Sequence, residues 1–244
     1  YGQLEDNYFQ SSVLDFDKDR SDRSTYKLLG GSIGFYGSTL NTRQYATKGY
    51  LEKLIAQVFT GRERFEPGNP QEGYSPSPQE RQSWLQISYM KEAYHTMGPK
   101  FTLGWMAEAL YSSKNFSENY TATMMQAGEF APTPHSKLMY NEAFRANQYV
   151  AAGIKPIYVL NDMFQFRTEF YGFTPIFPIK KNALNKAYYG KAFSRFEYMG
   201  EVSVICHLPF GAISAYVNHY SSPRREWNVG MTIGWQLFNY RFVE

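Results

Sequence analysis

Hydrophobic and polar residues alternate along two long segments of this chain. The apolar set in the first segment is Phe101, Leu103, Trp105, Ala107, Ala109 and Tyr111. In the second segment it is Trp227, Val229, Met231, Ile233, Trp235 and Leu237. A period of two residues is that of a β-strand with unlike faces. Each segment is about eleven residues long, enough to cross a bilayer at a tilt and about twice the length of an average soluble strand.

The same pattern predicts an all-β fold of roughly ten antiparallel strands across the whole chain. The expected spans are 7–17, 26–38, 49–62, 82–95, 100–113, 148–160, 163–174, 193–207, 211–220 and 226–241. Short turns near 97–100, 160–162 and 208–211 alternate with long polar loops at 66–80, 114–143 and 175–192. Short turns at one rim and long loops at the other are typical of an antiparallel transmembrane β-barrel, whose long loops face outward from the cell.

Composition adds an excess of aromatic residues to this picture. Aromatics make up 18% of the chain, although its mean hydropathy is −0.50. Tyr and Trp suit a membrane–water boundary, because one end of each ring is apolar and the other is wet. An aromatic-rich soluble β-sandwich or sugar-binding barrel has a similar composition. Net charge is +3 without a basic cluster, so no nucleic-acid partner is expected.

The alternation and the aromatic residues together define the positions expected to face lipid. Aromatic residues lie toward the ends of both segments, where outer-membrane barrels place aromatic girdles. Small residues such as Gly230 and Thr232 occupy the opposite face, which is expected to look into the interior. The predicted lipid-facing or girdle positions are Trp105, Tyr111, Trp227, Val229, Ile233 and Trp235.

Little in the sequence indicates chemistry. Residues 30–34 match the G-x-S-x-G nucleophile pattern, but they lie in a segment that continues as a strand, whereas that motif needs a turn followed by a helix. The four histidines are scattered, without metal-ligand spacing, and Cys206 is the only cysteine. We therefore expect no catalytic residue, cofactor or metal site in this chain.

One polar set is informative. Gln165, Arg167, Glu169 and Tyr171 alternate with more apolar neighbours. An Arg on the lipid face costs about 2–4 kcal/mol at the bilayer centre, so these residues are expected to point inward. Arg167 and Glu169 are then either solvated charges without a special role or members of an ion pair. Arg145, at the end of the longest loop, is a candidate partner if that loop folds inside.

Several segments together resemble the barrel region of patatin-like phospholipases from Bacteroidetes. The resemblance extends from about Asp6 to the C-terminus. The segments that carry it are 39–49 (TLNTRQYATKG), 61–68 (GRERFEPG), 144–149 (FRANQY), 151–153 (AAG), 166–171 (FRTEFY) and 237–241 (LFNYR).

This resemblance implies a particular domain organisation. The family places a patatin hydrolase domain and a POTRA-type domain before a BamA-like barrel of sixteen strands, which belongs to the bacterial surface antigen superfamily. Residues 1–244 are therefore expected to be the C-terminal barrel segment, with the upstream strands, the POTRA-type domain and the hydrolase before Tyr1. The Ser–Asp dyad of this serine lipid acyl hydrolase is expected upstream too, since no Asp-Gly pair occurs here.

The resemblance also implies a role for the longest loop. In the superfamily an inward loop carries an Arg held by an acidic residue on the wall, and five strands follow it. Arg145 and Glu169 are the matching residues here, and about five expected strands follow Arg145. The family pattern has Gly after this Arg, whereas this chain has Ala146, which puts tight packing at the loop tip in doubt.

The expected function is an outer-membrane barrel that anchors or translocates an attached patatin-like lipid hydrolase. The alternatives are a BamA-like assembly or transport component and a porin or scaffold subunit without enzymatic activity. The expected location is the bacterial outer membrane. Expected partners are outer-membrane lipid, the attached N-terminal domains and other outer-membrane proteins.

Overall fold

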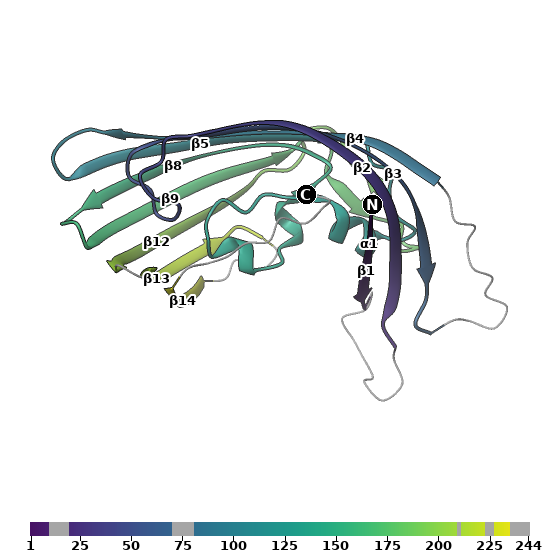
Figure 1. The fold of residues 1–244 in the computed structure, drawn as a ribbon. Coiled ribbons are helices and arrows are strands. Elements are labelled where there is room, and N and C mark those ends of the chain that lie inside the picture. Colours follow the sequence, from purple (N-terminus) through teal and green to yellow (C-terminus); the bar gives the residue numbers. More distant parts are fainter. Residues whose placement is uncertain (10–19, 70–80, 209–210, 223–226, 235–244) are drawn as a thin grey trace.

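One antiparallel sheet of ten strands dominates the structure, a computed structural model that describes residues 1–9, 20–69, 81–208, 211–222 and 227–234. Neighbours in the chain are neighbours in the sheet, so the topology is a meander (Figure 1). The strands are β1 (Gly2–Tyr8), β2 (Asp22–Ser38), β3 (Gly49–Glu66), β4 (Arg81–Thr96), β5 (Phe101–Ser112), β8 (Gln148–Val159), β9 (Phe164–Pro175), β12 (Glu197–Leu208), β13 (Gly211–Tyr220) and β14 (Trp227–Gly234). The prediction of an all-β fold is confirmed.

The remaining elements are short and lie in the two longest connections. The connection between β5 and β8 contains α1 (Tyr120–Gln126), β6 (Gly128–Glu129), two 3₁₀ turns (Ser136–Leu138 and Glu142–Phe144) and β7 (Arg145–Ala146). The connection between β9 and β12 contains β10 (Ile179–Lys181) and β11 (Ala187–Tyr189). Among the described residues no helix combines the length and apolar character needed to span a membrane.

The strand spans expected from alternation agree well with the structure, except at the two ends. The first strand was expected at 7–17, but β1 ends at Tyr8, and residues 10–19 lie outside the described residues. Alternation is weak in this stretch, where Asp and Lys interrupt the pattern. The last strand was expected at 226–241 and is described only to Gly234, so Trp235 also lies outside the described residues.

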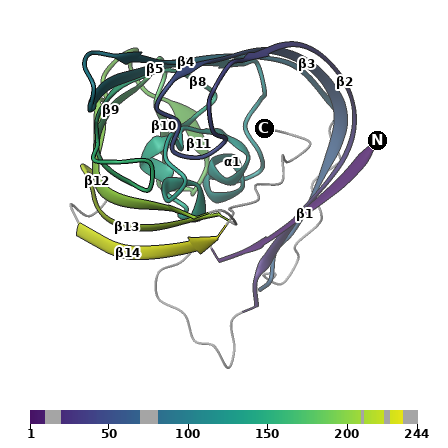
Figure 2. The ribbon, with the colours of Figure 1, turned by 60° about the vertical axis from the view of Figure 1, so that its left-hand side comes forward.

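The sheet curls into a deep trough with a convex and a concave face (Figures 1 and 2). β1 and β14 are its two edges, and no pairing joins them in the described part of the chain. Alternate residues of each strand face opposite sides, so in β9 the side chains of Gln165, Arg167 and Glu169 are buried while Phe166 and Phe170 are exposed. The inward direction predicted for this polar set is confirmed.

The convex face carries large apolar side chains that remain exposed in the described part of the chain. Ile33 and Val229 are 78% and 79% exposed, although both are large aliphatic residues within β-strands. Trp105 is half-buried, and its indole N–H donates to His95. The other described positions predicted to face lipid, Tyr111, Trp227 and Ile233, are all exposed on this face.

Large rings fill the concave face next to glycines. Gly104 pairs across strands with Tyr94, and Gly153 pairs with Tyr171. A Cβ atom at Gly104 would lie 2.7 Å from the Tyr94 ring, so glycine is needed for the close approach. The glycine-rich pattern at 30–34 has the same origin: it lies inside β2, where Gly30 makes room for Phe59, and no helix follows it.

Candidate functional site

Two connections fill the concave side of the sheet. The long one, residues 113–147, carries Phe130 and Phe144, whose rings pack against Phe173 of β9. The second, residues 39–48, joins β2 to β3 and approaches from the opposite rim, where Ala46 packs with Tyr94 and Ile157. Helix α1 of the long connection lies within the curl of the sheet in both views (Figures 1 and 2). The polar contacts that fix these two connections form the candidate site.

Arg145 organises the long connection from within. Its guanidinium donates to the backbone carbonyls of Met124, Met125 and Ala127 at the end of α1. It also pairs with Glu129 at 2.6 Å, and it lies over the ring of Tyr140. Cations are favourable at a helix C-terminus, and a buried guanidinium needs several acceptors. The side chain is buried, as expected for an inward loop, but these contacts all lie within the long connection itself.

The expected contact between Arg145 and Glu169 is not formed, which corrects the sequence-based pairing. Glu129 lies opposite Arg145 in the small ladder of β6 and β7, so the nearest carboxylate is local. Glu169 is occupied by Arg167, two residues away on the same face of β9, at 2.9 Å. The sequence pattern predicted that Arg145, Arg167 and Glu169 all point inward, but it could not predict which of them contact each other.

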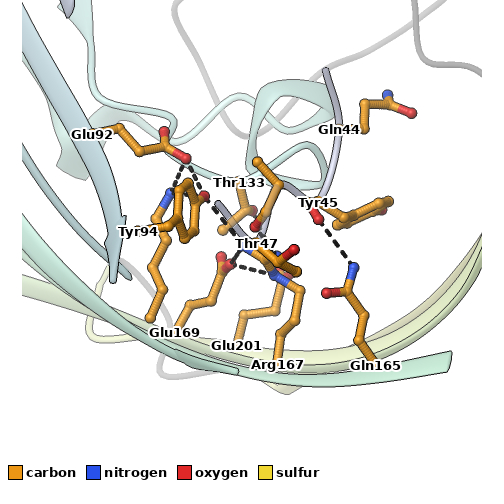
Figure 3. A network of polar contacts seen from close by, with 12 residues as sticks. Gln44, Tyr45, Thr47, Glu92, Tyr94, Thr133, Gln165, Arg167, Glu169 and Glu201 are labelled. Atoms are coloured by element: carbon orange, nitrogen blue, oxygen red, sulfur yellow. Dashed lines mark hydrogen bonds and ion pairs between the residues drawn. The ribbon is translucent and has the colours of Figure 1, made fainter. Parts of the chain in front are cut away.

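Arg167 and Glu169 are the centre of a buried network on the wall (Figure 3). Tyr171 donates to the second oxygen of Glu169 at 2.8 Å. On β8, Lys155 pairs with Glu92 at 3.1 Å, next to the hydroxyl of Tyr94. Three buried charges stay ionised in such a setting only when they are paired and hydrogen-bonded, and here each has at least one charged partner nearby.

The same wall residues hold the 39–48 connection in place. Arg167 donates to the backbone carbonyl of Ala46 at 2.9 Å, and Gln165 donates to that of Tyr45 at 3.1 Å (Figure 3). Tyr45 has a left-handed backbone with φ of 56°, which is uncommon for an aromatic residue. These contacts to backbone atoms compensate the strained turn and keep the connection inside the trough.

A second set of polar contacts joins the tip of the long connection to β12. The imidazole Nδ1 of His135 lies 2.7 Å from Glu201, and Thr133 donates to the other oxygen of the same carboxylate at 3.1 Å. The ring of His135 stacks on Tyr216 with centroids 3.5 Å apart. The wall carboxylate that holds the loop is therefore Glu201, not Glu169. Glu201 follows the same inward alternation in β12, so the sequence contained a signal for it.

Ser214, His135 and Glu201 stand in the order of a hydrolase triad. The Nε2 atom of His135 lies 3.2 Å from the Ser214 hydroxyl, and Nδ1 faces the carboxylate. A nucleophile must also reach a substrate. Here Ser214 is 1% exposed, its oxygen already accepts from the hydroxyl of Tyr45, and Tyr216 covers the imidazole. The trio therefore links β12 and β13 to both connections and has no room for an acyl group.

Lys114 fixes the start of the long connection. Its ammonium lies 5.0 Å from the ring centroids of both Tyr26 and Trp84, and it donates to Gln126. Burial lowers its pKa to about 8, although Glu63 and Asp6 act in the opposite direction. The folded protein therefore binds this proton more weakly than the unfolded chain does.

We expect stability to rise with pH because of Lys114. Between its folded pKa of about 8 and its ordinary value of 10.5, the unfolded state binds more protons, so the free energy of unfolding increases through this window. The gain approaches about 3 kcal/mol as an upper limit. The measurement is urea unfolding at pH 7.5 and pH 10. Between these pH values the wild type should gain more unfolding free energy than Lys114→Met does, but no more than a variant of the exposed Lys137 does. An equal difference at both pH values contradicts this assignment.

The described residues contain no group of three His, Cys, Asp or Glu side chains placed to hold a metal ion. Fold and site together define an all-β protein built from one curled antiparallel sheet, with two connections clasped to its polar concave face. Compared with protein-family models, curated proteins and solved structures, the chain matches none.

Proposed function

We propose that this chain forms part of the wall of a β-barrel in a bacterial outer membrane, and that it anchors or translocates an attached patatin-like lipid hydrolase. The observation that carries the first part is the unusual distribution of polarity across the sheet. The second part rests on the sequence segments that resemble the patatin-like phospholipases.

The distribution of polarity is unusual because large apolar side chains are exposed on the convex face, whereas several charged side chains are buried on the concave face beside the aromatic core. On the convex face Ile33, Phe170 and Val229 are all more than half exposed. On the concave face Arg167 and Glu201 are 3% and 2% exposed. A soluble curled sheet gains its stability by the opposite arrangement, because apolar burial is the main driving force of folding. In a membrane barrel the outer face meets hydrocarbon, and a polar interior is the rule.

The exposed apolar residues of the convex face form an apolar band, and this band runs diagonally across the rows of residues that pair between strands. Ile87, in the apolar part of β4, is the cross-strand partner of Tyr111 in β5. Tyr111 in turn pairs with Gln148, which is the first residue of β8. Trp105 shares a row with Ile154 in the middle of β8. A band that crosses the rows obliquely means that the strands are tilted relative to it. Strands of closed barrels tilt by about 35–45°.

An anchoring role suits the filled concave side. Buried charged side chains of the sheet, notably Arg167 and Glu201, contact both connections. A wall segment whose concave side is filled in this way supports holding an attached domain. The competing function is an assembly or transport component without an enzyme.

The whole gene product provides the test. We expect it to stay with outer membranes through a urea wash, to migrate faster on gels when unheated, and to release fatty acids from phospholipid vesicles. A serine-directed fluorophosphonate should label a peptide outside residues 1–244. Release by urea contradicts membrane insertion. Firm insertion without lipid hydrolysis or labelling contradicts the hydrolase and leaves the assembly component as the function.

A further inference from the structure

Three cations lie side by side across the convex face near one rim. Lys27 of β2 pairs directly with Arg62 of β3, which pairs directly with Arg81 of β4. All three side chains are exposed and point to the same side of the sheet. Strands lie about 4.8 Å apart, so the row spans about 10 Å. Like charges placed directly opposite each other on a sheet are destabilising.

Carboxylates compensate the neighbouring cations but not this row. Arg23 pairs with Glu5 and Glu66, and Arg64 also pairs with Glu66. In the described part of the chain Lys27 and Arg62 have no such partner, and Arg81 donates only to the hydroxyl of Thr60. Within the described residues no carboxylate relieves the repulsion in this row, as expected if an external anion completes it.

The three cations lie next to the apolar band, at a defined distance along β2. Leu29, 58% exposed, lies two residues from Lys27 on the same face, and Ile33 lies six residues away. At about 3.3 Å per residue these separations are about 7 Å and 20 Å. The three cations line a surface hollow of about 570 Å³, together with Leu29, with Arg23 and Arg64, and with the carboxylates Glu5 and Glu66 that pair with those two arginines. Apolar chains beside Leu29 and a negative headgroup over the cations would fit this surface together.

We propose that Lys27, Arg62 and Arg81 bind the phosphate of a membrane lipid headgroup, with the acyl chains lying along the apolar band below. This inference rests on the proposed membrane location. The row lies near the rim where β2 begins and β3 ends, which also carries the long connections 113–147 and 176–196, so the lipid belongs to the outward-facing leaflet. Guanidinium groups match phosphate oxygens by paired hydrogen bonds, so a row of two arginines and one lysine suits a phosphate group. A row about 10 Å wide suits one headgroup rather than a nucleic-acid backbone.

The test compares two variants in detergent micelles doped with lipid A or with its dephosphorylated form. One variant carries Lys27→Gln, Arg62→Gln and Arg81→Gln. The control carries Lys91→Gln, which removes a convex-face cation that Glu52 already pairs at 3.4 Å. Thermal unfolding of the whole gene product gives the readout. We expect lipid A to raise the Tm of the wild type and of Lys91→Gln by several degrees, and to leave the triple variant unchanged.

A second readout separates this site from general charge loss. Without lipid A, the triple variant should be at least as stable as the wild type, because it removes repulsion. Equal stabilisation of all three proteins by lipid A contradicts the proposed site, as does equal stabilisation by the dephosphorylated lipid. Stabilisation by inorganic phosphate at the same concentration shows a soluble anion and overturns the lipid. Heat-modifiable migration of the same samples reports insertion separately, so failure of the site and failure of the membrane location are distinguishable.

Discussion

Ile33→Arg is expected to block insertion of the protein into lipid bilayers. Ile33 is 78% exposed on the convex face of β2, so in water the substitution costs almost nothing. At the centre of a bilayer an arginine on the lipid face costs about 2–4 kcal/mol. The measurement is the fraction of protein that becomes heat-modifiable after refolding into vesicles, and we expect it to fall at least ten-fold.

Thr25→Arg is the matched control. Thr25 lies on the same face of the same strand, eight residues away, beside Arg64 in the register and beyond the apolar band. At about 3.3 Å per residue it is about 26 Å from Ile33, near the rim. We expect it to insert normally. If both variants insert equally, or if the wild-type protein dissolves without detergent, the convex face does not meet hydrocarbon and the proposed function fails.

Glu169→Gln is expected to cost about 3–5 kcal/mol of unfolding free energy, the largest effect we expect on the concave side. The amide keeps the shape of the side chain but removes the charge that neutralises Arg167, which would remain buried. The contact of Arg167 with Ala46 should weaken with it, so the 39–48 connection should become accessible to protease. Urea unfolding measures the first effect, and limited proteolysis measures the second.

Double-mutant cycles decide which arginine Glu169 serves. Glu169→Gln combined with Arg167→Met should show a coupling of about 2 kcal/mol or more, whereas the combination with Arg145→Met should be additive within about 0.5 kcal/mol. Glu118→Gln, which breaks an exposed ion pair with Lys186, should change stability by less than about 0.5 kcal/mol. Strong coupling between Glu169 and Arg145 would restore the pairing expected from the sequence and contradict the assignment to Arg167.

The alternation of side chains by itself determined the all-β fold and the direction of most side chains. Because successive residues of a strand face opposite sides, the sequence pattern alone assigns Arg167 and Phe170 to opposite faces. The strand ends near turns were also predictable, since Gly, Pro and Asn interrupt the pattern there. Sequence alone missed the start of the first strand, because β1 begins at Gly2 and ends at Tyr8 whereas a strand was expected from residue 7, and residues 10–17 of that expected strand lie outside the described residues.

Partner choice inside the trough was decided only by the tertiary structure. Alternation gives the face of a residue, but it does not give the distance between residues on different elements. Arg145 meets Glu129 because a two-residue ladder closes within its own connection, and His135 meets Glu201 because the same connection folds back onto β12. The cation row on the convex face likewise depends on register: Lys27, Arg62 and Arg81 are far apart in the chain and become neighbours only when β2, β3 and β4 pair.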